Sequence, residues 1–152
     1  MEKLEIKAEK PNIILIVIDC LRSDRTFGAD RTAKTPNLHA LADDGVVFTD
    51  LITANTMTIP CMTTMFSGTY PQKHGVRAMV GSRVSDDIPL LAEVLQANGY
   101  HTYAEATGPL SNYYHLDRGF DQYEVRDGVQ DSFLGAWGDD LIDRFRSGAF
   151  AE

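Results

Sequence analysis

Thr58 is the residue around which the sequence gathers its clearest chemical pattern. Pro60 suits the first turn of a helix, because it lacks an N–H group and its φ is already near the helical value. A hydroxyl at a helix N-terminus faces backbone N–H groups and the positive end of the helix dipole, which together bind sulfate or phosphate groups. Thr58 is therefore a candidate nucleophile for an anionic ester, and the alternative is that its hydroxyl only caps the helix.

A carboxylate and a thiol, Asp19 and Cys20, directly follow an apolar run at residues 13–18. A run that is apolar on both faces predicts a central parallel strand buried under helices. Ligands of open α/β sheets bind beyond the carboxyl ends of the strands, where Asp19 emerges. Asp19 is thus either a metal ligand or a cap for the next turn. Cys20 is either a further ligand or a buried, inert thiol.

The elements that position these residues alternate between helix and strand. Glycine and proline signals predict helices between Thr35 and Gly45, between Asp86 or Asp87 and Gly99, and over 129–146, and strands over 46–52 and 100–106. Residues 118–123 are predicted to form a loop with aromatic anchors, and His74 is interpreted as a structural hydrogen-bonding residue. This alternation with short joints predicts a layered α/β fold.

Composition limits the classes of function. The chain has 152 residues, enough for one α/β domain, and its net charge of −8 argues against nucleic acid or an anionic membrane as a partner. An anionic substrate would then need positive charge gathered locally, which a bound metal supplies. Residues 13–18 are too few to span a bilayer, and no signal peptide is visible. Two cysteines, Cys20 and Cys61, make no disulfide framework, so we expect a cytoplasmic location.

Five segments together resemble the N-terminal region of the sulfatase family in their order and spacing. They are PNIILIVIDCLRSD, TPNLHALADDGVVFTD, TMTIPCMTTMFSGTYPQKHGV, LLAEVLQANGYHT and LDRGFDQYE, which cover most of residues 11–124. The resemblance implies an alkaline-phosphatase-like fold, a three-layer α/β/α sandwich with a mostly parallel sheet. It also implies hydrolysis of sulfate or phosphate esters at a metal-supported nucleophile.

The resemblance assigns roles to three residues. Asp19 corresponds to a metal ligand, and many sulfatases have a second aspartate where this chain has Cys20. Thr58 corresponds to the nucleophile, which ordinary sulfatases supply as a cysteine or serine converted to formylglycine and followed by proline and arginine. Here Pro60 is present, but Met62 stands at the arginine position. The chain therefore resembles a threonine-nucleophile branch, closer in this respect to phosphodiesterases.

The chemistry of a threonine nucleophile differs from that of formylglycine. Thr58 has one hydroxyl, so water must cleave its covalent ester, and a metal bound to Thr58 would help to generate the alkoxide. Cys20 in place of a hard oxygen ligand favours Zn²⁺ or Mn²⁺, with Ca²⁺ and Mg²⁺ as the alternatives. The expected substrate is a small-molecule sulfate or phosphate ester.

The resemblance also bears on domain organisation. Further metal ligands of the family lie well beyond position 152, so residues 1–152 are expected to form the N-terminal part of a sulfatase-type catalytic domain whose C-terminal part is absent. The alternative function is that of a catalytically incomplete fragment or an anion-binding remnant of such an enzyme. The oligomeric state is left open by the sequence.

Overall fold

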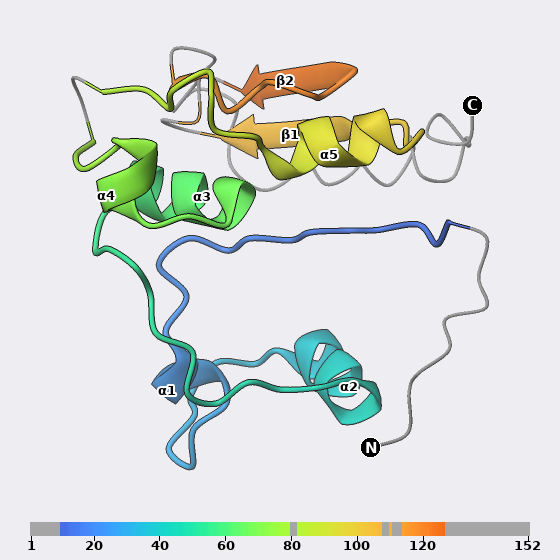
Figure 1. The fold of residues 1–152 in the computed structure, drawn as a ribbon. Coiled ribbons are helices and arrows are strands. Elements are labelled where there is room, and N and C mark those ends of the chain that lie inside the picture. Colours follow the sequence, from blue (N-terminus) through green and yellow to red (C-terminus); the bar gives the residue numbers. More distant parts are fainter. Residues whose placement is uncertain (1–9, 80–81, 108–109, 111–113, 127–152) are drawn as a thin grey trace, which may run out of the picture. The chain divides into compact units, whose positions relative to one another are not determined.

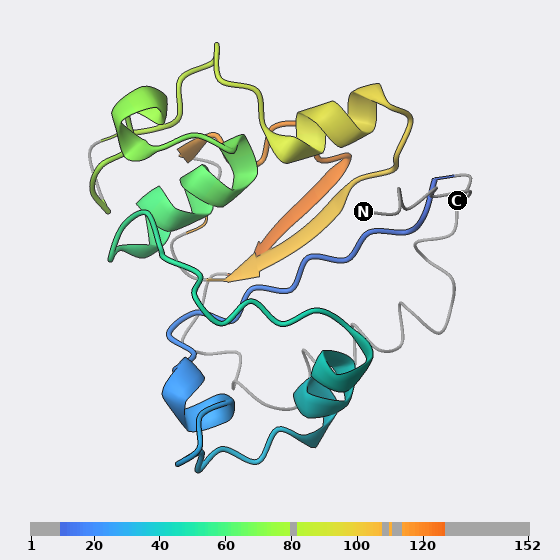
Figure 2. The ribbon, with the colours of Figure 1, turned by 60° about the horizontal axis from the view of Figure 1, so that its bottom comes forward.

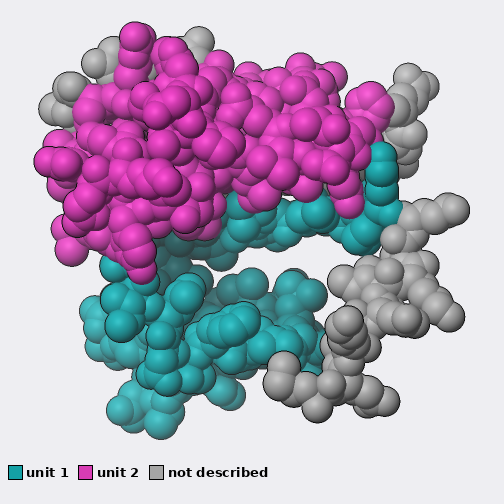
Figure 3. Space-filling view, viewed as in Figure 1, with its two compact units in different colours: residues 1–53 teal, residues 54–152 magenta. Residues whose placement is uncertain are grey.

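The structure of the chain is a computed structural model that describes residues 10–79, 82–107, 110 and 114–126. The chain divides into two compact units, residues 1–53 and residues 54–152, which Figure 3 distinguishes by colour. The helix predicted over 129–146 lies outside the described residues.

The first unit contains two short helices joined through one histidine. Helix α1 spans Ser23–Thr26 and helix α2 spans Pro36–Asp44, with Pro36 at its start and Gly45 after its end as the sequence predicts. His39 of α2 donates its Nε2 proton to the carbonyl oxygen of Thr26 at 2.9 Å, and its ring stacks on Phe27 with the ring centroids 5.4 Å apart. This pair of contacts holds α2 against the end of α1.

The two strands predicted in the first unit are not formed. Residues 13–18 and 46–52 lie in no strand, and their apolar side chains are exposed, with Ile16 at 74% and Ile52 at 91%. The prediction of a buried central strand is therefore wrong for this structure. Its physical reason is that strands exist through hydrogen bonds to neighbouring strands, and no strand occurs among described residues 10–53 to pair with them.

The second unit places a parallel sheet beside helices (Figures 1 and 2). Its elements are helices α3 (Thr58–Ser67), α4 (Pro71–His74) and α5 (Leu91–Ala97) and strands β1 (Tyr103–Thr107) and β2 (Gln122–Arg126). The strands pair in parallel, from Tyr103 opposite Gln122 to Thr107 opposite Arg126. A parallel pair needs a crossover connection, so the α/β class predicted from sequence is confirmed by this unit.

Three predicted boundaries in the second unit need correction. The strand predicted over 100–106 begins three residues later, because β1 spans Tyr103–Thr107. Helix α5 begins at Leu91, later than the predicted Asp86 or Asp87. The carboxylate of Glu93 accepts the N–H of Leu90 at 2.8 Å, and this contact caps the N-terminal end of the helix at Leu90. Asp86 instead contacts His115 at 3.2 Å. The predicted loop over 118–123 ends earlier than expected, because β2 begins at Gln122, although the rings of Phe120 and Tyr123 do contact each other.

The core of the second unit is built on the inner face of α3. Ile59 is fully buried and Met62 nearly so, and Phe66 packs against the same cluster. The other buried members come from the segments that follow α4 and from the segment before β2: Val76, Val84, Ile88, Leu90, Tyr114 and Leu116. Burying a large aliphatic side chain contributes about 1.5–3 kcal/mol, so this cluster is the main force that holds α3 in place.

The segment before β2 is tied to the rest of the unit by polar contacts. Arg118 donates to the carbonyl oxygen of Ile88 at 2.5 Å and lies 3.5 Å from the Glu93 carboxylate. Asp121 accepts the backbone N–H of Thr102 at 2.8 Å, and this hydrogen bond is the main reason that the pKa of Asp121 is lowered. These contacts fix the start of β1 and the approach to β2.

Two glycines with positive φ offer a matched pair for testing this packing. Gly68 has φ 62° with open space around a would-be Cβ, whereas Gly119 has φ 81° and a Cβ there would clash with the backbone of Ala92 and Glu93. We expect Gly68→Ala to cost about 1–2 kcal/mol of unfolding free energy and Gly119→Ala roughly 3–5 kcal/mol. Chemical denaturation of the two variants measures both values. Equal losses would show that α5 does not pack closely on Gly119.

Candidate functional site

Thr58 is the first residue of α3, half-buried, and not its cap. Met57 occupies the N-cap position in extended backbone, with φ −112° and ψ 143°, and its side chain makes no capping hydrogen bond. The interpretation of Thr58 as the N-cap is therefore wrong, because the N-cap is Met57 and the helix begins one residue earlier than the position of Pro60 predicts. Gly68 follows the last helical residue in the left-handed conformation, a common helix end.

The remaining hydroxyls of α3 are committed to structural hydrogen bonds. Thr63 is fully buried and donates to the carbonyl oxygen of Ile59 at 2.8 Å, and Ser67 donates to that of Thr63 at 2.6 Å. The hydroxyl of Thr64 contacts the ring of His74 at 3.1 Å. Thr58 differs from these residues in its place, because it is the first residue of the helix.

The loop before Thr58 is fastened by Asn55, a residue that the sequence analysis did not single out. Its side-chain oxygen accepts the N–H of Met57 at 3.0 Å, and its carbonyl oxygen accepts the thiol of Cys61 at 2.9 Å. An asparagine that bonds the backbone two residues ahead is a turn signal that could have been found from the sequence.

His74 has the structural role that the sequence predicts. Its side chain is fully buried, and its Nδ1 atom accepts the N–H of Val76 at 3.1 Å. Since Nδ1 is an acceptor, the neutral ring carries its proton on Nε2 and donates it to Thr64. Burial lowers the pKa of His74, so the ring stays neutral and links α4 to α3.

Asp19 and Cys20 lie in the first unit, where both side chains are exposed. Cys20 has φ 57°, a left-handed conformation that is uncommon for residues other than glycine, asparagine and aspartate. Nearby, Arg22 and Asp24 form an ion pair at 2.7 Å. Thr58 belongs to the other unit, so the shared site of Thr58 with Asp19 and Cys20 stays a prediction.

The described residues do not by themselves fit a metal ion. Among them, no group of three or more histidine, cysteine, aspartate or glutamate side chains comes together. Neither Cys20 nor Cys61 forms a disulfide bond. A metal bound at Asp19 would therefore need ligands other than those that the described part of the chain gathers.

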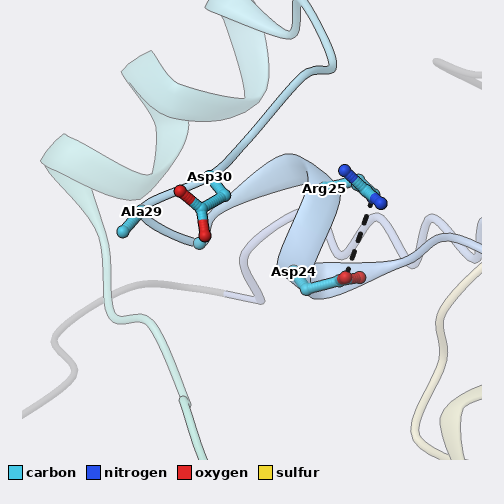
Figure 4. Close-up of a pocket in the computed structure, with 5 residues that line it drawn as sticks. Asp24, Arg25, Ala29 and Asp30 are labelled. Atoms are coloured by element: carbon cyan, nitrogen blue, oxygen red, sulfur yellow. Dashed lines mark ion pairs between the residues drawn. The ribbon is translucent and has the colours of Figure 1, made fainter.

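A hollow of about 220 Å³ lies beside α1, lined by Asp24, Arg25, Gly28, Ala29 and Asp30. In Figure 4, Arg25 points back to Asp24, and the two side chains are 3.8 Å apart. Asp24 is also paired with Arg22, and this pair lowers the pKa of the Asp24 carboxyl. None of the predicted site residues lines this hollow.

A comparison with known families decides the relationship of the chain. The family model described as Sulfatase matches residues 11–140, which include Asp19, Cys20 and Thr58. The chain belongs to the sulfatase family.

Relatives of this sulfatase-family chain agree with that assignment. An ulvan-active sulfatase of Formosa agariphila is 32% identical over 123 residues, covering 78% of this chain and 24% of the relative. The crystal structure of Ps i-CgsB superimposes with a TM-score of 0.66 and 29% identity, covering 92% of this chain and 33% of that one. The structure of Ps i-CgsB in complex with k-i-k-neocarrahexaose gives a TM-score of 0.58 at 25% identity, covering 83% and 30%.

These findings confirm the alkaline-phosphatase-like α/β fold class predicted for this sulfatase-family chain. The chain spans about a quarter of the length of the ulvan-active relative, at 24%. In the part of the chain that the structure describes, no helix is both long and apolar enough to cross a membrane.

The buried histidine generates a prediction about pH. The lowered pKa of His74 means that the unfolded chain, where histidine titrates near pH 6.5, takes up a proton at higher pH than the folded chain does. The stability that depends on neutral His74 is therefore present above about pH 6.5 and is lost as the pH falls below that value towards the folded pKa. Denaturation curves between about pH 7.5 and about pH 5 measure this loss.

A glutamine at this position tests the assignment. His74→Gln keeps an amide donor for Thr64 and does not titrate, so we expect a flatter pH profile than that of the wild type. His101→Gln is the matched control, since the side chain of His101 is 82% exposed, and its profile should follow the wild type. A profile of His74→Gln as steep as that of the wild type would contradict a buried neutral histidine.

Proposed function

We propose that the protein hydrolyses sulfate esters and that Thr58 is its covalent nucleophile. The observation that carries the proposal is the position of Thr58 as the first residue of α3, inside the segment that the family model matches. Helix α3 is ten residues long and has no carboxylate in its first turn, whereas the first turn of α5 carries Glu93. An anion at the N-terminal end of α3 is therefore favoured by the helix dipole and meets no like charge in that turn.

The proposed reaction has two steps. In the first step, the Thr58 oxygen forms a bond to the ester sulfur, the bond from sulfur to the ester oxygen breaks, and the alcohol leaves with the threonine proton. In the second step, water attacks the sulfur, the Thr58 oxygen leaves and takes back a proton, and sulfate is released. A single hydroxyl cannot expel sulfate by re-forming an aldehyde, so water is required in the second step.

The substrate class that we propose is a sulfated carbohydrate. One relative is described as an ulvan-active sulfatase, and the structure of Ps i-CgsB was solved with k-i-k-neocarrahexaose. A phosphate ester is the second candidate, favoured by the threonine at the nucleophile position, because a phosphorylated threonine is likewise cleaved by water.

Thr58 has a matched control two residues away. We expect Thr58→Ala to abolish hydrolysis of p-nitrophenyl sulfate by the purified protein, a loss of at least about 10³-fold in kcat, because no oxygen remains to attack the sulfur. Thr56 is exposed in the preceding loop, and Thr56→Ala should keep the wild-type rate. Quenched wild-type reactions should show a gain of about 80 Da on the peptide containing Thr58, the mass of a bound sulfuryl group.

Parallel assays identify the esterified acid. Hydrolysis of p-nitrophenyl phosphate in preference to the sulfate, lost in Thr58→Ala, would establish the second candidate. Retention of activity in Thr58→Ala would contradict the nucleophile assignment for either substrate. A wild-type protein inactive on both substrates, with or without added metal, would favour an anion-binding remnant.

The proposal includes a divalent cation with Asp19 and Cys20 among its ligands, which would supply charge neutralisation for the anionic substrate. A thiolate ligand favours Zn²⁺ most, and the loss of a hard oxygen ligand weakens Ca²⁺ and Mg²⁺ sites, so Zn²⁺ or Mn²⁺ is the proposed metal. After treatment with a chelator, we expect activity to disappear and to return more fully with Zn²⁺ or Mn²⁺.

A substitution at Cys20 tests the ligand assignment. Cys20→Asp supplies a hard oxygen, and aspartate tolerates the left-handed backbone at this position better than cysteine does. The variant should therefore gain activity with Ca²⁺ or Mg²⁺ relative to Zn²⁺, measured as the ratio of rates after reconstitution. An unchanged ratio would show that Cys20 is not a ligand.

A further inference from the structure

Three hydrogen bonds surround Thr58 without including its side chain. The side-chain oxygen of Asn55 accepts the N–H of Met57 at 3.0 Å. The thiol of Cys61 donates to the carbonyl oxygen of Asn55 at 2.9 Å. The backbone N–H of Cys61 donates to the carbonyl oxygen of Met57 at 3.2 Å. Together these bonds connect Asn55, three residues before Thr58, to Cys61, three residues after it.

The helix start depends on these bonds because its own residues lack the usual caps. Met57, at the N-cap position, has no oxygen in its side chain, and Pro60 has no N–H to donate to one. Asn55 compensates by forming a turn with the residue two positions ahead, a geometry typical of asparagine. The side chains of Asn55 and Cys61 are both half-buried, so these bonds are partly protected from water.

We propose that Asn55 and Cys61 are positioning residues that hold the Thr58 hydroxyl in the orientation needed for attack. This inference rests on the proposed function of Thr58. The bonds fasten the loop at one side of Thr58 to the first turn of the helix at the other, so the backbone of Thr58 is fixed from both directions. Neither residue touches the substrate in this role.

Such a role predicts an effect on kcat and not on KM. The substrate anion is held in the ground state by the helix end and its surroundings, whereas the alignment of the attacking oxygen matters only as the new bond forms. Losing one of the hydrogen bonds lets Thr58 spend less time in the attacking geometry. We expect a fall of about five- to tenfold in kcat, the size of one neutral hydrogen bond, with KM changed less than about twofold.

The experiment uses paired variants of the whole protein. Asn55→Ala and Cys61→Ala remove the bonds, whereas Asn55→Ser keeps an acceptor and Cys61→Ser keeps a donor, so each serine variant should restore most of the kcat. Asn98→Ala is the control, because Asn98 makes a similar bond from its side chain to the carbonyl oxygen of Val94 at the end of α5. Its kcat should equal that of the wild type.

Hydrogen exchange supplies a readout that does not depend on activity. The Met57 amide should exchange about five- to tenfold faster in Asn55→Ala than in the wild type, while Asn98→Ala leaves it unchanged. Faster exchange together with a lower kcat, an unchanged KM and rescue by serine establishes the positioning role. Faster exchange with an unchanged kcat overturns it. A fall in kcat accompanied by a changed KM and a lower thermal stability also overturns it, because that pattern indicates a general loss of structure.

The same set of assays separates this inference from the proposed function. If Thr58→Ala abolishes activity while Asn55→Ala and Cys61→Ala keep the wild-type kcat, the nucleophile stands and the positioning role is wrong. If Thr58→Ala is active, the proposed function is wrong, and the positioning role falls with it because Thr58 then has no attack to make.

Discussion

The packing of one face of α3 determines where the candidate nucleophile lies. Ile59 and Thr63 are completely buried on that face, while Met65 on another face is 45% exposed. Because a helix is stiff over ten residues, fixing its inner face also fixes the direction of its first turn. The neutral ring of His74 adds a hydrogen bond to Thr64, so α4 holds the same helix from outside the apolar cluster. The position of Thr58 is thus a consequence of contacts made further along the helix.

Signals that act within a few residues could be predicted from the sequence. Gly68 ends α3 through its left-handed backbone, and Pro36 begins α2 through its fixed φ. His74 bonds the N–H of Val76 two residues ahead. Each of these features depends little on the rest of the chain. Residues 13–18 show the opposite case. Their apolar pattern favours a strand, yet a strand forms only where neighbouring backbone is available to bond with it, which a local pattern does not reveal.

Contacts between distant residues could not be predicted at all. Arg118 reaches the carbonyl oxygen of Ile88, thirty positions earlier, and Asp121 reaches Thr102. The bond from the Cys61 thiol to Asn55 joins residues only six positions apart, yet the spacing of Cys61 from Thr58 gives no indication of it. Of the candidate site, the place of Thr58 near the start of a helix and the turn at Asn55 were predictable, and the bond from the Cys61 thiol to Asn55 was not.

If Thr58 is the nucleophile, as we propose, a threonine in place of formylglycine places a demand on its surroundings. A threonine ester persists until water reaches it, so the site must exclude water while the ester forms and admit it afterwards. Thr58 is half-buried, whereas Thr63, one and a half turns along the same helix, is fully buried with its hydroxyl bonded to the backbone. Of these two threonines, only Thr58 is partly exposed to solvent. The N-terminal end of α3 would therefore suit both proposed steps, since the helix dipole favours an anion there and the half-buried Thr58 is partly accessible to water.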